Sequence, residues 1–180
     1  LRRPGTVASP RLQEGKETNV RLASGAIDGV VVQPGEFFSY HALVKRPSRL
    51  RGYRLGLELH EEREAAGIGG GCCQVSNLLY WLGLQSGLRI VERHRHALDL
   101  FPDHRRSVPF GCGATVFYNY RDLRMQNPHS QAVRFGLRIQ DGRLRGEVRA
   151  PVDLGLQVQV EELDHRFLKE SDGAVWRENR

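Results

Sequence analysis

Long apolar runs and lysine are scarce in this chain of 180 residues. Because no apolar run approaches the roughly 20 residues that a membrane-spanning helix needs, we expect no membrane span within the chain. Lysine occurs only at Lys16, Lys45 and Lys169, so the net charge of +6 rests almost entirely on arginine. The arginines are spread along the sequence and accompany no nucleic-acid-binding motif, which argues against a nucleic-acid partner.

Cysteine is also scarce, and its pattern bears on compartment and cofactor. The chain has three cysteines, and Cys72 and Cys73 are adjacent, which is not the pattern of a secreted disulfide framework. This favours a reducing, cytoplasmic setting. The chain begins at Leu1 rather than Met, so a signal peptide or anchor could precede it, and the cell envelope stays open. Neither CxxC nor HExxH is present, so we expect no metal and no other cofactor.

The most informative segment is a glycine run that leads into the cysteine pair. Gly69 to Gly71 precede Cys72 and Cys73, and apolar residues then recur at helical spacing up to a plausible C-cap at Gly87. A cysteine at a helix N-terminus lies among backbone N–H groups and the positive end of the helix dipole, which lower thiol pKa. Cys73 is therefore our candidate nucleophile, although a buried structural cysteine remains an alternative.

The residues around Cys73 are candidates for substrate contacts. Gly70 and Gly71 would let a substrate approach the backbone closely. Gln74 could donate a side-chain N–H to an oxyanion, and Ser76 could contact the substrate or cap the helix. Each of these residues also has a purely structural reading.

A histidine-rich strand follows the predicted helix. Residues 88–96 begin as a β-branched, alternating strand, and Glu92, His94 and His96 would share one of its faces. A strand that folds back along the helix could bring an imidazole to Cys73, as cysteine nucleophilic catalysis requires. We assign His96 as the general base and Glu92 as the residue that orients it, with Asp99 as the alternative orienting group.

The remaining pattern predicts one α+β domain, with the cysteine at the N-terminus of a central helix that packs on a mostly antiparallel sheet. Residues 1–16 are expected to form a flexible arm, and a short helix is expected over residues 17–27. Residues 17–150 would form the main domain. A C-terminal β extension of the same domain would cover residues 151–180.

The strand signals are concentrated after the central helix. Alternating apolar residues on both sides of Asp141-Gly142 predict a hairpin over residues 133–148. Further strands are expected over residues 114–120 and 156–160. A second hairpin is expected around Asp172-Gly173.

Several separated blocks of the chain resemble the VanW family, which is named after an accessory protein of vancomycin-resistance clusters. The blocks are QPGEFFSY at residues 33–40, RGY at residues 51–53, GGGCCQVSNLLYWLGLQSGLRIVERHRH at residues 69–96 and FPDHRRSVPFGCGATVFYNYRDLRMQNP at residues 101–128. The resemblance extends roughly from residue 19 to residue 150.

The resemblance implies a link to the bacterial cell wall rather than an established activity. The cysteine of the family's GGGxCQ element corresponds to Cys73. The family's ER-x-x-H element corresponds to Glu92, Arg93 and His96. Many members have an aspartate before the ATV block, where this chain has Gly113 and therefore no carboxylate.

Three functional readings stay open. In the first, the chain is a Cys-His hydrolase or transferase that acts on an amide or ester of peptidoglycan or of a cell-wall precursor. In the second, it is a non-catalytic module that binds a peptidoglycan fragment or a wall-assembly partner, and arginines such as Arg93 contact carboxylates. In the third, Cys73 binds zinc with His94 and with His96 or His104. The oligomeric state stays open.

Overall fold

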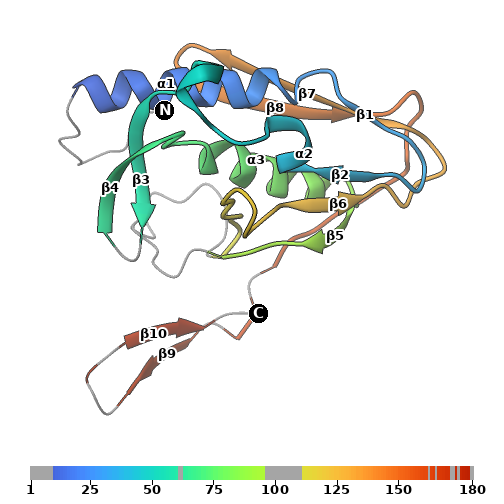
Figure 1. The fold of residues 1–180 in the computed structure, drawn as a ribbon. Helices are drawn as coiled ribbons and strands as arrows, with labels where there is room; N and C mark the ends of the chain where they lie inside the picture. Colours follow the sequence, from blue (N-terminus) through green and yellow to red (C-terminus); the bar gives the residue numbers. More distant parts are fainter. Residues whose placement is uncertain are drawn as a thin grey trace.

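The computed structural model describes residues 10–60, 63–95, 111–161, 163–164, 166–170, 173 and 175–178. It has mixed helical and strand structure in one small domain, with hairpins toward the C-terminus (Figure 1), which confirms the predicted α+β class. The elements are α1 (Pro10–Gly25), β1 (Val31–Val32), β2 (Phe37–Ser39), α2 (Tyr40–Val44), a 3-10 turn (Arg49–Arg51), β3 (Leu55–His60), β4 (Arg63–Ile68), α3 (Cys73–Gln85), β5 (Arg89–Glu92), β6 (Arg124–Gln126), β7 (Val133–Gln140), β8 (Arg143–Arg149), β9 (Arg166–Lys169) and β10 (Val175–Glu178).

The paired strands of the described chain are all antiparallel. They form a three-stranded sheet in the order β1-β7-β8, a second in the order β2-β6-β5, and the hairpins β3-β4 and β9-β10. Helix α3 lies at the centre of the body (Figure 1), in contact with α1, β5 and β8. The predicted central helix is confirmed, and Cys73 is its first residue.

Apolar side chains from both three-stranded sheets and from α1 and α3 form one core. One face of α1 is fully buried through Val20 and Ala23. From α3, Val75 and Leu79 are fully buried as well, as the helical spacing of the apolar residues predicts. Gly83 leaves room for the sulfur of Met125, because a Cβ at Gly83 would lie 2.4 Å from that atom.

The predicted hairpins are present. Asp141 and Gly142 join β7 to β8 with φ values of 52° and 68°, as a two-residue turn with both residues in the left-handed region requires. β9 and β10 form the second hairpin, which Figure 1 shows apart from the body. None of the described helices is long and apolar enough to cross a membrane.

Other expectations differ from the structure. α1 begins at Pro10 rather than at residue 17, so residues 10–16 of the expected arm are helical, and Gly15 and Lys16 are buried. Proline is suited to the first turn of a helix, and Gly15 fits because a Cβ there would lie 1.8 Å from the carbonyl oxygen of Leu55 in β3. Close packing against β3 therefore accounts for a helical segment that the polar sequence does not indicate.

Two predicted strands are wrong. Residues 114–120 make only isolated bridges, between Thr115 and His94 and between Phe117 and Arg121. Residues 156–160 belong to no strand. In the first case, the backbone of Ala114 bonds to the side chains of Ser76 and Asn77 in α3.

Candidate functional site

The glycines before α3 are packed against other parts of the chain. A Cβ on Gly70 would lie 2.1 Å from the carbonyl oxygen of Gly56 in β3, and a Cβ on Gly56 would lie 2.5 Å from the carbonyl oxygen of Gly70. Asn19 of α1 is fully buried beside them. Its amide donates to the carbonyls of Gly70 and Arg54 at 3.0 and 2.9 Å, and its oxygen accepts from the Arg54 N–H at 2.8 Å. These contacts fix the backbone that leads into the cysteine pair.

The two neighbouring glycines have left-handed backbone. Gly69 has φ of +90° and packs against Pro47, and Gly71 has φ of +98° and packs against the side chain of Lys16. Both conformations favour glycine because it has no Cβ. The structure thus supplies a packing role for Gly70 and Gly71, where the sequence suggested the approach of a substrate.

The adjacent cysteines lie in different environments. Cys72 is 7% exposed, and its Sγ lies 3.9 Å from the carbonyl oxygen of Asn19. Cys73 is only partly buried, and its Sγ lies 4.0 Å from the carbonyl oxygen of Val116. In the described chain all three cysteines are thiols, with no disulfide. Of the adjacent pair, Cys73 is the more accessible to a ligand.

Tyr40 packs against the helix start from the side of α2. Its hydroxyl donates to the Cys72 carbonyl at 3.5 Å. Burial, followed by the charges of Cys72 and Cys73, raises the pKa of Tyr40 well above its ordinary value. Tyr40 therefore stays neutral beside the cysteines and acts as a hydrogen-bond donor.

The first turn of α3 uses some of the N–H groups that we expected to be available. The Gln74 N–H donates to the Gly71 carbonyl at 3.0 Å, and the Val75 N–H donates to the Cys72 carbonyl at 2.9 Å. The side-chain oxygen of Gln74 is buried and has no hydrogen-bond partner among the described residues. This oxygen, a hydrogen-bond acceptor, is consequently the atom of Gln74 that remains for a donor group of a ligand.

Segment 113–116 lies along α3 and forms a wall beside Cys73. Ser76, which is fully buried, donates from its hydroxyl to the Ala114 carbonyl at 2.6 Å. Asn77 accepts from the Ala114 N–H at 2.7 Å. The sequence suggested Ser76 as a substrate contact. In the structure its hydroxyl bonds segment 113–116 to α3.

Arg93, which directly follows β5, holds the same wall in place. Its Nε donates to the Gly113 carbonyl at 2.8 Å, its Nη2 donates to the Gly111 carbonyl, and its guanidinium lies 4.7 Å from the ring centre of Tyr80. Burial lowers the pKa of Arg93 from its very high ordinary value. The described partners of the Arg93 guanidinium are thus two backbone carbonyls and the Tyr80 ring, all within the protein.

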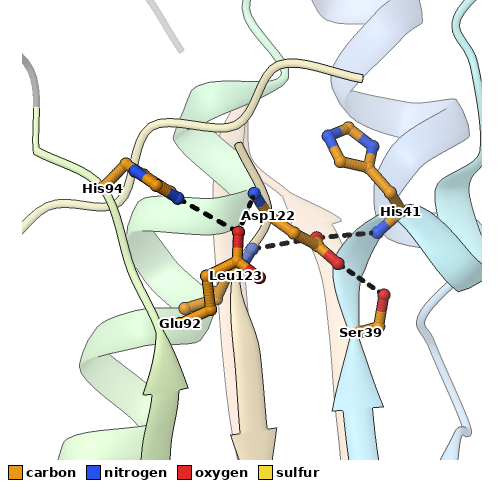
Figure 2. Close-up of polar contacts among 6 residues, drawn as sticks. All are labelled: Ser39, His41, Glu92, His94, Asp122 and Leu123. Atoms are coloured by element: carbon orange, nitrogen blue, oxygen red, sulfur yellow. Dashed lines mark hydrogen bonds and ion pairs between the residues drawn. The ribbon is translucent and has the colours of Figure 1, made fainter. Parts of the chain in front are cut away.

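Glu92 and His94 form a pair at the end of β5 (Figure 2). Glu92 Oε1 lies 3.0 Å from His94 Nε2 and accepts from the Asp122 N–H at 2.9 Å. The bond from Asp122, together with His94, lowers the pKa of Glu92. His96 and Asp99 lie outside the described residues, as does His104. The imidazole that the structure places on Glu92 is therefore that of His94.

Asp122 links this pair to α2 (Figure 2). Its Oδ2 accepts from the Ser39 hydroxyl at 2.5 Å, and its Oδ1 accepts from the N–H groups of His41 and Leu123 at 3.0 and 2.9 Å. Ser39 in turn caps α2 by accepting from the Ala42 N–H. This capping fixes the backbone that carries His41.

The His41 ring is held between two tyrosines, edge-on to Tyr40 and Tyr118 with ring centres 5.2 and 5.4 Å away. Both of its nitrogens are buried and have no hydrogen-bond partner among the described residues. Burial lowers the pKa of His41, while the Asp122 carboxylate and nearby backbone carbonyls oppose that shift. The lowered pKa favours the neutral form of this imidazole.

In the described chain, the buried polar side-chain atoms without a partner are the His41 nitrogens, the Gln74 side-chain oxygen and the Thr115 hydroxyl. Gln74 follows Cys73 directly, and Thr115 precedes Val116, whose carbonyl contacts the Cys73 sulfur. Such atoms cost about 1–3 kcal/mol each, and they call for a specific explanation.

Sequence reasoning missed His41, Asp122 and Thr115. A histidine directly after the PGEFFSY block was a visible signal, whereas nothing local indicated that Asp122 would contact Ser39, 83 residues earlier. No group of three or more His, Cys, Asp or Glu side chains that could hold a metal occurs within the described ranges.

Together these features define a small α+β domain with an accessible thiol at the start of a buried helix. Residues 15–149 match the family model described as VanW like protein, and the chain belongs to this family. This confirms the resemblance seen in the sequence.

Two curated relatives match at sequence level. Vancomycin B-type resistance protein VanW of Enterococcus faecalis (strain ATCC 700802 / V583) is 29% identical over 161 residues, which cover 89% of this chain and 58% of the relative. Uncharacterized protein YoaR of Bacillus subtilis (strain 168) is 35% identical over 123 residues, which cover 67% of this chain and 38% of the relative. The chain thus spans little more than half of the first relative and less than half of the second. No solved structure matches.

Proposed function

We propose that this protein acts in vancomycin resistance as a cysteine-dependent hydrolase or transferase on an amide or ester of peptidoglycan or its precursors. The observation that carries the proposal is the partly buried thiol of Cys73 at the first residue of α3, where the positive end of the helix dipole favours a thiolate. Buried polar atoms without a partner on Gln74 and Thr115 are further groups that a ligand could use. The name of the enterococcal relative supports the link to vancomycin resistance.

Cys73 is the proposed nucleophile. Its thiolate would attack the carbonyl carbon, and the carbonyl electron pair would move onto the oxygen as an oxyanion. The amide N–H of the Gln74 side chain is the proposed donor to that oxyanion. When the tetrahedral intermediate collapses, the amine or alcohol would leave with a proton from an imidazolium, and a thioester would remain on Cys73. Water would then release an acid in a hydrolase, and an acceptor amine or hydroxyl would take the acyl group in a transferase.

His96 is the proposed general base, as the family element implies, with Glu92 orienting the ring. The contact between Glu92 and His94 makes His94 the second candidate for this role. In either case Glu92 would hold one ring nitrogen and stabilise the positive charge that forms on the imidazole.

The remaining predicted contacts divide into two groups. Gln74 is the proposed substrate contact. Gly70, Gly71, Ser76 and Arg93 support the frame through the contacts described above, which position the helix start and the wall beside the thiol.

The alternative is a non-catalytic module that binds peptidoglycan or a wall-assembly partner. The hydrogen bonds within the first turn of α3 favour it, because they leave fewer N–H groups for an oxyanion. In this alternative Cys73 would line the binding site without forming a covalent bond.

The two proposals separate in an assay with defined muropeptides and lipid-free precursor peptides. The wild-type protein and the Cys73→Ser and Cys112→Ser variants are each incubated with the substrates, and the products are identified by mass spectrometry. We expect a cleaved or transferred product with wild type and Cys112→Ser, and none with Cys73→Ser. Binding that persists in Cys73→Ser, without product formation by any of the proteins, would instead establish the binding module.

A further inference from the structure

The turn between Phe117 and Arg121 is a rigid feature at the edge of the site. The Phe117 N–H donates to the Arg121 carbonyl at 2.8 Å, and the Phe117 carbonyl accepts from the N–H groups of Tyr120 and Arg121 at 2.9 and 2.8 Å. Asn119 has φ of 67°, a left-handed conformation that asparagine tolerates better than most residues. These bonds fix the backbone on which the aromatic side chains stand.

Two aromatic rings of this turn face solvent together. Phe117 is 52% exposed and Tyr120 is 78% exposed. Their ring centres lie 5.5 Å apart with an angle of 45° between the ring planes. Tyr118, between them in sequence, packs instead against His41 and anchors the turn. The two exposed rings therefore form a pre-organised apolar surface, which we call the 117/120 platform.

The platform adjoins both halves of the candidate site. Val116, directly before Phe117, offers its carbonyl to the Cys73 sulfur. Asp122, directly after Arg121, donates its N–H to Glu92, which contacts His94. The backbone that carries the platform is thus continuous with the segments that contact the thiol and the carboxylate–imidazole pair.

We propose that Phe117 and Tyr120 form a stacking subsite for a pyranose ring of the wall glycan. This inference rests on the proposed function, because it names the part of the substrate that the same site would hold. The C–H face of a pyranose is apolar and fits flat against an aromatic ring, which is also apolar and carries negative charge density on its face. Asn119 and Arg121, both exposed at the turn, supply polar groups at the rim for the sugar's hydroxyl and acetamido groups.

The size of the platform favours a sugar over a protein partner. Two aromatic side chains bury about 150–250 Å² each at most, whereas a standard protein interface needs about 800 Å² on each partner. The exposed residues beside the rings in sequence, Asn119 and Arg121, are polar. These features match one or two sugar rings better than a protein surface.

The test is calorimetric binding of tetra-N-acetylchitotetraose, a glycan without peptide, to the full chain and its variants. Phe117→Ala combined with Tyr120→Ala should weaken binding about tenfold or more, since each ring is lost as a stacking partner. Tyr120→Phe should bind within about twofold of wild type, because the ring remains. The matched control is Trp176→Ala, which removes a 51% exposed aromatic ring from the separate β9-β10 hairpin and should leave binding unchanged.

The free stem pentapeptide serves as the second ligand and distinguishes the parts of the wall. Binding of the glycan that depends on the platform supports the inference. Binding of only the pentapeptide, glycan binding that the double variant retains, or no glycan binding by wild type would overturn it. Circular dichroism and thermal melting of the double variant confirm that it is folded, and the exposed Tyr120→Ala single variant gives a second reading. The alkylation rate of Cys73 is measured separately on the same proteins. If the platform proposal fails, glycan binding does not depend on the two rings; if the cysteine proposal fails, Cys73 is alkylated no faster than an ordinary thiol.

Discussion

Replacing Gly70 with alanine should destabilise the protein by about 2–4 kcal/mol. The added Cβ would lie 2.1 Å from the oxygen and 2.3 Å from the carbonyl carbon of Gly56. Both atoms are backbone, so β3 must move away from the start of α3. Overpacking of this kind costs about 1–3 kcal/mol. Movement of β3 also strains the buried Asn19 bond to the Gly70 carbonyl, which contributes about 1 kcal/mol.

Gly25→Ala is the matched control. Apart from its chain neighbours and the nearby helix backbone, no atom lies within 4 Å of a Cβ at Gly25, which is the last residue of α1. Alanine is the better helix former, so this variant should be neutral or more stable by up to about 1 kcal/mol. Both variants are compared with wild type by urea denaturation at neutral pH.

The comparison also separates two explanations of the glycine run. If Gly70 is present for packing, Gly70→Ala lowers the midpoint of unfolding strongly and Gly25→Ala does not. If its role is only to let a substrate approach, Gly70→Ala would have the stability of wild type and lose only ligand binding. A free energy of unfolding within about 0.5 kcal/mol of wild type would refute the packing argument.

Three further predictions concern the hydrogen bonds of Asn19, Glu92 and Arg93. Asn19→Ala should cost about 2–4 kcal/mol in chemical denaturation, because it leaves buried backbone groups without partners. Glu92→Gln should be less stable than wild type at neutral pH, and the difference should disappear on acidification. The folded pKa of Glu92 is lowered, so its contribution is present above the ordinary carboxyl pKa and is lost as pH falls through the lowered value; denaturation across pH 3–7 checks this. Arg93→Lys should speed hydrogen exchange in segment 111–116, because a lysine cannot replace both guanidinium bonds to the Gly111 and Gly113 carbonyls. Unchanged exchange there would contradict the role of Arg93 in holding the wall.

Periodic patterns predicted the central parts of the fold. The spacing of Val75 and Leu79, with Gly87 after the helix, predicted α3, because a helix buries every third or fourth residue on one side. Strict alternation around Asp141-Gly142 predicted β7 and β8 in the same way. Alternation also placed Glu92 and His94 on one face of the strand, where the structure has them in contact.

The segments that the sequence did not predict depend on long-range contacts. Segment 113–116 is rich in β-branched and apolar residues, yet its backbone bonds to the side chains of Asn77, Ser76 and Arg93. These bonds join residues that are distant in the sequence and produce no periodic signal. The same holds for Asp122, which is joined to Ser39 and to the backbone of His41 across about 80 residues.

The pH dependence of Cys73 alkylation in the folded protein tests the central claim most directly. The measurement uses a Cys72→Ala, Cys112→Ala background, with His96→Ala and His94→Ala added in turn. We predict an apparent thiol pKa well below the reference of about 8.5, with a rise when the partner imidazole is removed. An ordinary or raised thiol pKa that neither histidine variant changes would contradict the account and make Cys73 a structural residue.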